Sequence, residues 1–201
     1  MGGFFCPRRA NCHDEELMAD SEILLAVTGG IAAFKSAALA SSLVQQGYGV
    51  RVVQTESATR FVGTQTFSAL TSRPVITDLF DPQFPLGAHI ELARQSDLLC
   101  VAPASANFMA KAASGIADDL LSTLYLCFTG PVLVAPAMNC EMWEKPATQR
   151  NLQQLRDDGV QIIDPDEGWL SCRVQGVGRM ADPVKIHGEI DAIVDPKPTK
   201  D

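Results

Sequence analysis

The stretch ILLAVTGG, residues 23–30, decides the fold class of this chain. Its first five residues form a continuous apolar run, which is the pattern of a central parallel strand buried on both faces. Two glycines follow, and residues 31–46 then carry apolar side chains near helical spacing, with Gly47 suited to the helix end. A buried strand that leads through a glycine turn into a helix is typical of a parallel α/β sheet.

The same alternation of strands and helices continues along the chain. Further strands are predicted at residues 50–53, 75–76, 98–102, 132–135 and 161–163. Helices are predicted at residues 61–70, 89–94, 107–114, 119–128, 146–158 and 184–194. The pattern indicates an α/β protein with a single-domain, doubly wound parallel sheet and helices on both faces. We expect residues 21–195 to form this domain, residues 1–20 a disordered leader and residues 196–201 a tail.

Composition and charge narrow the possible functions. The 201 residues are 46% hydrophobic and 20% charged, as expected for one globular domain. The net charge of -8 argues against nucleic-acid binding, which needs a basic face. No apolar run approaches the roughly 20 residues that span a bilayer, and the N-terminus is not a secretory signal. We therefore expect a cytoplasmic protein that binds neither membranes nor nucleic acid.

The six cysteines do not predict a disulfide framework in a chain of this length. Cys100 and Cys127 lie in apolar segments and are expected to be buried thiols. Cys6, Cys12 and His13 are not accompanied by a second ligand pair at zinc-site spacing, so we predict no metal site.

Polar segments follow four of the predicted strands, at residues 28–31, 55–57, 103–108 and 136–139. Because the carboxyl ends of parallel strands share one edge of a sheet, these segments are expected to meet there. Their backbone amides and hydroxyls can hold a phosphate or a polar ring. Ser57 either contacts such a ligand or caps the helix that follows it. The glycine pair is weak support on its own, because the full GxGxxG pattern and the P-loop lysine are missing.

Three single residues are candidates for chemistry. Asn139 lies in PAMNCEMW, residues 136–143, and its amide can donate and accept hydrogen bonds. The large apolar side chains of this segment either line a ligand site or pack in the core. His89 opens a helix and is either an acid/base near neutral pH or a structural histidine. Cys172 lies in a Gly-rich stretch, residues 168–179, which we interpret as a loop or flap. Its thiol either moves a proton when the flap closes or is an ordinary exposed cysteine.

In their order along the chain, these segments resemble the homo-oligomeric flavin-containing cysteine decarboxylases. The resemblance covers roughly residues 21–194 and rests on GGIAAFK (29–35), His89, PASAN (103–107), PAMNCEMW (136–143) and the stretch from Cys172 to Met180. It implies a Rossmann-like flavoprotein fold with FMN as the cofactor. It also implies decarboxylation of 4'-phosphopantothenoylcysteine to 4'-phosphopantetheine in coenzyme A biosynthesis.

The chemistry of that family implies a redox-neutral reaction sequence. The cysteine side chain of the substrate is oxidised to a thioaldehyde by hydride transfer to FMN. The carboxylate then lies β to an electron-withdrawing C=S group, so that loss of CO2 leaves a stabilised enethiolate. Return of the hydride, with a proton from a protein acid, gives the product.

The resemblance also assigns roles to individual residues. His89 is the acid/base near the reacting cysteine, and Cys172 donates the proton for the reductive half-reaction. The substrate-binding residues implied are Asn139, Met138, Gly176 and Arg179. The residues expected to line the FMN site are Gly29, Gly30, Ile31, Thr55, Ser57, Ser105, Ala106, Asn107, Phe108 and Ala137. Phe108 departs from the family's usual Ser-Ala-Asn-Thr, in which a threonine hydroxyl contacts FMN.

The family also suggests partners and alternatives. Its members form trimers, some of which assemble into dodecamers, with FMN and substrate at subunit contacts, so we expect a homo-oligomer. Many bacteria fuse this enzyme to a phosphopantothenate–cysteine ligase, and the present chain is expected to be either free-standing or cut from such a fusion. The alternatives are a peptidyl-cysteine decarboxylase of lantibiotic processing, a flavin prenyltransferase and a non-enzymatic regulatory flavoprotein. His89 and Asn139 argue against the prenyltransferase.

Overall fold

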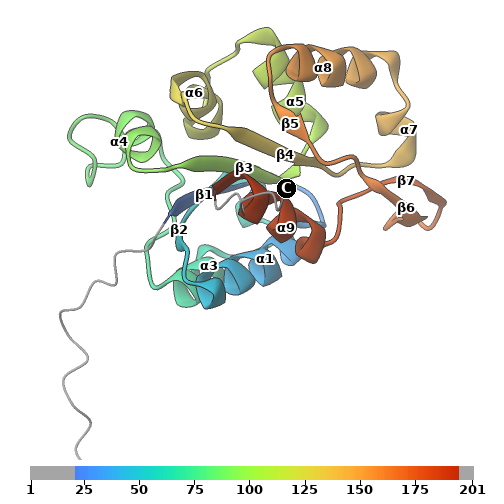
Figure 1. Cartoon of the computed structure of the whole chain (residues 1–201). Coiled ribbons are helices and arrows are strands. Elements are labelled where there is room, and N and C mark those ends of the chain that lie inside the picture. Colours follow the sequence, from blue (N-terminus) through green and yellow to red (C-terminus); the bar gives the residue numbers. More distant parts are fainter. Residues whose placement is uncertain (1–20, 195–201) are drawn as a thin grey trace, which may run out of the picture.

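The computed structural model describes residues 21–194 and places one parallel sheet between two layers of helices (Figure 1). The strands of this sheet are β1 (Glu22–Val27), β2 (Gly49–Gln54), β3 (Leu98–Ala104), β4 (Val132–Pro136) and β5 (Gln161–Ile162). Their spatial order is β2-β1-β3-β4-β5. This arrangement confirms the predicted doubly wound α/β fold, and the strand order reverses between β1 and β3.

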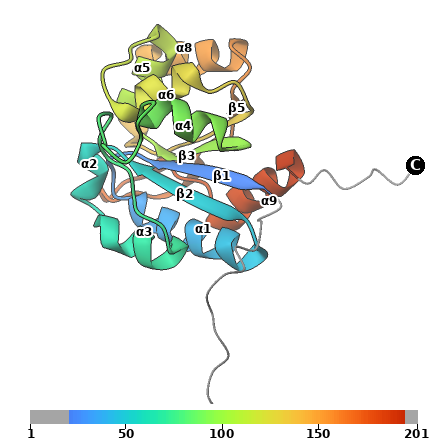
Figure 2. The same ribbon diagram turned by 90° about the vertical axis from the view of Figure 1, so that its left-hand side faces the viewer.

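Helices cover both faces of the sheet (Figures 1 and 2). One face carries α1 (Ala33–Gln46), α3 (Thr64–Thr71) and α9 (Pro183–Val194). The other face carries α4 (Ala88–Arg94), α5 (Ala106–Ser114), α6 (Leu120–Cys127) and α8 (Pro146–Asp157). Two short helices, α2 (Glu56–Thr59) and α7 (Cys140–Trp143), follow the carboxyl ends of β2 and β4.

The apolar run of β1 is buried on both faces because successive side chains of a strand point to opposite sides. Ile23, Leu25 and Val27 pack in the core shared with α1, α3 and α9. Leu24 and Ala26 pack in the core on the other side of the sheet. None of the five side chains is accessible to solvent. The continuous hydrophobicity of this segment therefore specifies the central position of β1.

The Gly-rich stretch at residues 168–179, interpreted from the sequence as a loop or flap, contains two paired strands and is not an irregular loop. It forms an antiparallel hairpin from β6 (Asp166–Trp169) and β7 (Gln175–Arg179), joined by a short turn that contains Cys172. Because Gly168 pairs with Gly176 in the hairpin, the strands lack the alternation of apolar side chains by which strands are recognised.

Smaller differences concern element boundaries. The strand expected at residues 75–76 is reduced to one bridge between Ile76 and Val53. The helix expected from residue 61 begins at Thr64, after Gly63 as its N-cap. The expected leader (1–20), the tail (196–201) and the cysteines and histidine of the leader lie outside the described residues. Among the helices of residues 21–194, none has the length and hydropathy that a bilayer span requires.

The start of α6 is held by a capping box joined to an ion pair. Asp119 accepts a hydrogen bond from the backbone N–H of Ser122 at 2.8 Å, and the Ser122 hydroxyl accepts from the backbone N–H of Asp119. Lys111 of α5 donates to the Asp119 carboxylate at 2.7 Å. Burial opposes ionisation of Asp119, but the hydrogen bonds from Lys111 and Ser122 hold its pKa below the ordinary value.

Two substitutions of Asp119 should distinguish the contribution of its helix cap to stability from the contribution of its negative charge. Asp119→Ala should lower the free energy of unfolding by about 1 kcal/mol at pH 7, and Asp119→Asn, which keeps an N-cap acceptor, should lose less. The pKa of Asp119 is lower in the folded than in the unfolded protein. Ionised Asp119 therefore stabilises the fold above the ordinary carboxyl pKa, and this stabilisation is lost as the pH falls through the pKa of Asp119 in the folded protein. The difference between wild type and Asp119→Asn in urea denaturation should therefore shrink below about pH 4. Equal losses for both variants at every pH would contradict this assignment.

Candidate functional site

The exit segments of β1 and β3 are tied together by the hydroxyl of Thr28. This hydroxyl donates to the carbonyl of Pro103 at 2.7 Å and accepts from the backbone N–H of Ser105 at 2.8 Å. The Ser36 hydroxyl donates to the carbonyl of Ala102 at 2.6 Å and adds a second link between α1 and β3. The tie lies where the strand order reverses, which is where open α/β sheets bind ligands. The sequence analysis placed Thr28 in an exit segment but assigned it no role.

Two cavities open beside this tie and share Ser105. The first, which we call the polar cavity, has a volume of about 640 Å³ and lies among the ends of β2 and the starts of α2, α5 and α6. The second, which we call the hairpin cavity, has a volume of about 480 Å³ and lies among the start of α1, residues 137–142 and the β6–β7 hairpin. Both volumes suit small-molecule ligands.

Most of the residues singled out in the sequence line one of these cavities. The polar cavity is lined by Thr55, Ser57, Ser105, Asn107 and Phe108. The hairpin cavity is lined by Gly29, Gly30, Ile31, Ser105, Ala106, Ala137, Met138, Asn139, Cys172 and Arg179. The predicted residues that line neither cavity are His89 and Gly176. Lys35 and Trp169, which the sequence analysis did not select, line the hairpin cavity.

The glycine turn brings the two cavities close together. A Cβ atom at Gly29 would lie 2.5 Å from the Ser57 hydroxyl oxygen, so only glycine lets β1 and α2 approach this closely. A Cβ atom at Gly30 would meet nothing within 4 Å, so that position borders open space. The first glycine is therefore required by packing, and the second leaves room at the cavity wall.

Three helices at this edge begin with a side-chain cap. Thr55 caps α2 by accepting from the N–H of Ala58, so the residue that caps this helix lies two positions before Ser57, where a cap was one of the two expected roles. Ser105 caps α5 by accepting from the N–H of Phe108. Asn139 caps α7 through its Oδ1, which accepts from the N–H of Glu141 at 2.7 Å. This bond fixes the orientation of the Asn139 amide and leaves its two Nδ2 hydrogens to donate to a ligand.

The hairpin rests on the exit segment of β4 through backbone contacts. The N–H of Met138 donates to the carbonyl of Gly178 at 2.9 Å. Gly178 has a φ of 148°, and a Cβ atom there would collide with the Met138 carbonyl oxygen. The hairpin turn carries the exposed Cys172. By contrast, burial raises the pKa of Cys100 to about 12, which leaves that thiol unreactive.

His89 is remote from the hairpin cavity. It lies in the first turn of α4, and Figure 1 shows α4 and the β6–β7 hairpin at opposite ends of the molecule. Within residues 21–194, its Nδ1 atom is buried without a hydrogen-bond partner. One copy of the chain therefore does not bring His89 and Cys172 together.

Phe108 is 4% exposed, and its ring packs edge-on against Tyr125 at a centroid distance of 5.9 Å. Its backbone N–H is already used by the Ser105 cap. A ligand in the polar cavity would therefore meet an apolar surface at this position, in place of a hydroxyl.

The family model described as Flavoprotein matches residues 12–195 of the chain. The chain belongs to the flavoprotein family. This flavoprotein is 48% identical over 171 residues to the coenzyme A biosynthesis bifunctional protein CoaBC of Bacillus subtilis (strain 168), which covers 85% of the chain and 42% of that relative. It is 40% identical over 187 residues to CoaBC of Vibrio vulnificus (strain YJ016), and the match covers 92% of this chain and 47% of that relative. The chain thus spans less than half the length of these relatives.

Solved structures show the same fold. The flavoprotein superposes on the FMN-dependent cysteine decarboxylase SpaF with a TM-score of 0.78 and 35% identity, covering 88% of this chain and 96% of that one. A second similar structure is a cysteine-to-serine mutant of PPC decarboxylase complexed with pantothenoylaminoethenethiol. The TM-score is 0.77 at 33% identity, and the match covers 85% of this chain and 96% of that one. The resemblance to flavin-containing cysteine decarboxylases stated from the sequence is thereby confirmed.

The docking of the hairpin can be tested at Gly178. Gly178→Ala should displace β7, because both the positive φ and the Met138 carbonyl exclude a side chain. The amide hydrogen of Met138 should then exchange with solvent about 10- to 100-fold faster, for a local cost of about 1–3 kcal/mol. The matched control is Gly188→Ala in α9, where a Cβ atom meets nothing within 4 Å and exchange at Met138 should not change. Unchanged exchange in Gly178→Ala would contradict the docking.

Proposed function

We propose that this flavoprotein is a carboxy-lyase that decarboxylates 4'-phosphopantothenoylcysteine to 4'-phosphopantetheine, with FMN as its cofactor. The observation that carries the proposal is the hairpin cavity, in which Asn139, Cys172 and the glycine turn after β1 meet. The similarity to CoaBC proteins and to a PPC decarboxylase supports the same reaction.

The two cavities fit FMN in chemistry and size. Capped helix starts and the hydroxyls of Thr55 and Ser57 surround the polar cavity, and such groups hold phosphate. Open space at Gly30 and the apolar side chains of Ile31 and Met142 border the hairpin cavity, which suits a flat aromatic ring. The cofactor-binding residues proposed from the sequence would hold FMN across both. When bound, FMN supplies acceptance and return of a hydride.

The substrate would bind with its cysteine carboxylate at Asn139. Because Oδ1 of Asn139 is engaged by Glu141, its amide presents only donors to the cavity, and these suit a carboxylate. Cys172 lies on the hairpin turn above the same cavity and would donate the proton that completes the product. We propose that the hairpin acts as a flap that brings this proton donor to the substrate after the substrate has entered.

We infer that the complete site forms between copies of the chain, in a homo-oligomer such as a trimer or a dodecamer. The helix α4, which carries His89, lies at the opposite end of the molecule from the hairpin that carries Cys172, so the two residues can act on one substrate only across a subunit contact. Large apolar side chains near both ends are exposed, including Phe34 (60%) and Phe80 (84%). A head-to-tail contact would cover such side chains and bring His89 of one copy to the hairpin cavity of the next.

The CoaBC relatives are more than twice as long as the segment that matches this chain, and we infer a partner enzyme from this difference. Because the chain matches 42% of the B. subtilis CoaBC protein, we propose that a phosphopantothenate–cysteine ligase acts beside it. We propose that the reaction takes place in the cytoplasm, where such a ligase would supply the small phosphorylated substrate. A peptidyl-cysteine decarboxylase, a class of enzyme with the same fold, is the second candidate.

The proposed reaction is tested by product analysis of the purified protein. It should be yellow from bound FMN, and incubation with 4'-phosphopantothenoylcysteine should give 4'-phosphopantetheine and CO2 by mass spectrometry. Decarboxylation of a cysteine-terminated peptide, with no reaction of the small substrate, would favour the second candidate. Yellow protein with neither activity would contradict both.

The role of Cys172 predicts an arrested reaction. Cys172→Ser should still release CO2, because decarboxylation precedes the protonation that this thiol is proposed to carry out. The oxidised enethiol product should then accumulate in place of 4'-phosphopantetheine. Cys127→Ser is the control, since Cys127 lies at the end of α6 and lines neither of the two cavities beside the Thr28 tie. Normal product formation by Cys172→Ser would remove this residue from the mechanism.

The shared site predicts complementation between inactive variants. His89→Asn and Cys172→Ser should each fail to form the product alone, while remaining yellow. Co-expressed in equal amounts and mixed at random, they should regain about a quarter of the wild-type activity, because each head-to-tail contact needs His89 from one copy and Cys172 from the other. Activity that does not return in verified mixed oligomers would contradict the shared site.

A further inference from the structure

The hairpin cavity contains two cations whose presence the steps above do not explain. Lys35 lies in the first turn of α1, and Arg179 is the last residue of β7. Both line the hairpin cavity together with Asn139 and Cys172. Within residues 21–194, neither side chain forms an ion pair with a carboxylate. Two cations thus border one cavity without a direct counter-ion.

Lys35 is anchored but keeps donors for a ligand. Its Nζ donates to the carbonyl of Met180 at 2.8 Å, which uses one of the three ammonium hydrogens. Burial and the charge of Arg179 lower the pKa of Lys35, whereas Asp182 and Asp166 act in the opposite direction. Because both residues line the same cavity, their charges act on one another.

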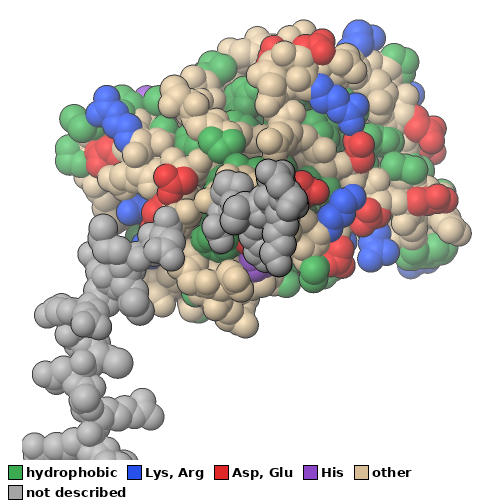
Figure 3. Space-filling model, viewed as in Figure 1, with side chains coloured by type: hydrophobic (Ala, Val, Ile, Leu, Met, Phe, Trp, Pro, Cys, Tyr) green, Lys and Arg blue, Asp and Glu red, His purple; other side chains and the backbone are tan. Residues whose placement is uncertain are grey.

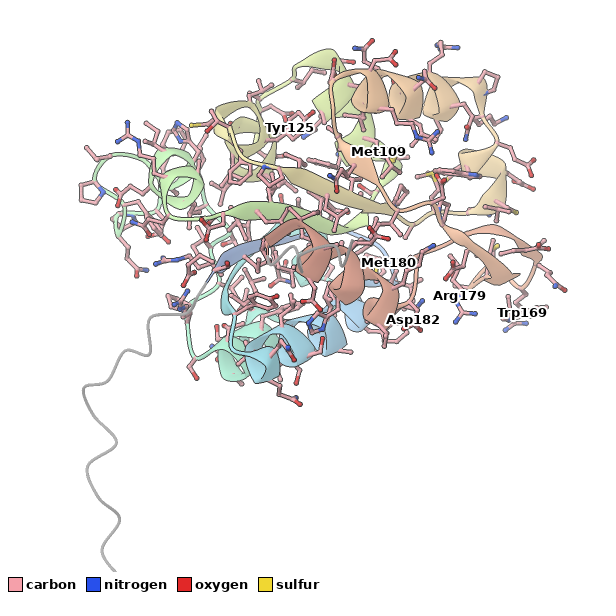
Figure 4. All side chains as sticks on the ribbon, viewed as in Figure 1. Met109, Tyr125, Trp169, Arg179, Met180 and Asp182 are labelled. Carbon is pink, nitrogen blue, oxygen red and sulfur yellow. The ribbon has the colours of Figure 1, made fainter. Side chains whose placement is uncertain are left out.

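Arg179 has space for its guanidinium because a glycine lies beside it. A Cβ atom at Gly168 would be 3.2 Å from Nη1 of Arg179, so glycine leaves room for the planar head group. Figure 4 shows the Arg179 and Trp169 side chains extending from the hairpin on the same side. In the space-filling view, basic and acidic side chains gather at this end of the molecule (Figure 3). The exposed guanidinium is therefore open to an incoming ligand.

A phosphate monoester is the ligand that best matches this pair. It carries a charge of about -1.5 to -2 near neutral pH and offers three acceptor oxygens. Arginine binds such a group with its planar fork and lysine as a point charge. The proposed substrate carries a phosphate monoester at the end remote from the reacting cysteine. FMN also carries one, but the hydroxyls of Thr55 and Ser57 that suit it line the other cavity.

We propose that Lys35 and Arg179 form a phosphate-monoester subsite of the hairpin cavity, which the terminal phosphate of the substrate occupies. The identity of that substrate rests on the proposed function. The subsite makes the enzyme selective for a phosphorylated small molecule over its unphosphorylated analogue or a peptide. Without the phosphate, the two neighbouring cations would keep their mutual repulsion.

The test measures binding of 4'-phosphopantetheine and of pantetheine to the full-length, FMN-loaded protein by isothermal titration calorimetry. The variants are Lys35→Gln and Arg179→Gln, with Arg173→Gln as the matched control. Arg173 lies in the turn of the same hairpin, is exposed and does not line the cavity. Each test variant should weaken binding of 4'-phosphopantetheine by about 10- to 100-fold. Binding of pantetheine should not change, and the control should bind both ligands as the wild type does.

Several outcomes would overturn the subsite. Equal weakening for both ligands would indicate a structural role, and no weakening would exclude phosphate contact. If the two test variants lose the absorbance of bound flavin but keep the preference for 4'-phosphopantetheine over pantetheine, Lys35 and Arg179 bind the phosphate of FMN and not that of the substrate. The proposed function fails in a different way. In that case the wild type binds 4'-phosphopantetheine more tightly than pantetheine and the two variants lose this preference, yet the wild type fails to decarboxylate 4'-phosphopantothenoylcysteine. That result would support the subsite and contradict the proposed reaction.

Discussion

The buried hydroxyl of Thr28 fixes the edge of the sheet on which both cavities depend. It bonds to Pro103 and Ser105 at once, so the ends of β1 and β3 are held in one position relative to each other. Leaving such buried polar groups unpaired would cost about 1–3 kcal/mol each. Because α1 and α5 start from these two strand ends, the tie also sets where the helices begin. The two cavities that share Ser105 follow from this arrangement.

Strong periodic signals made most of the fold predictable. The apolar run of β1 identified a strand buried on both faces, and the polar exit segments marked the edge of the sheet at which the two cavities open. The two strands of the hairpin at residues 166–179 were not predicted, because paired glycines carry no hydrophobic pattern. The cap of α2 lies at Thr55, two positions before Ser57, for which capping was one of two predicted roles; both residues carry a hydroxyl that can cap a helix, so the sequence does not distinguish them.

The site was predictable only where residues follow strands or where a family motif names them. Asn139 and the glycine turn satisfy both conditions and line the hairpin cavity. The place of His89 at the far end of the molecule is set by packing of α4, which no local pattern reveals. Lys35 was missed for a related reason. Its contact with the carbonyl of Met180 joins positions 145 residues apart, and helix periodicity alone marks it as an ordinary solvent-facing lysine.

The way the hairpin is attached makes it a replaceable unit. Its contacts with the rest of the flavoprotein include the backbone bond between Gly178 and Met138 and the contact of Gly176 with Cys140. Both contacts are made with residues that follow β4, and neither is made with a strand of the central sheet. Residues in the hairpin turn and along its exposed side can therefore change without rebuilding the sheet. One scaffold can in this way acquire different substrate preferences by exchanging a short, self-paired segment, while the edge of the central sheet stays constant.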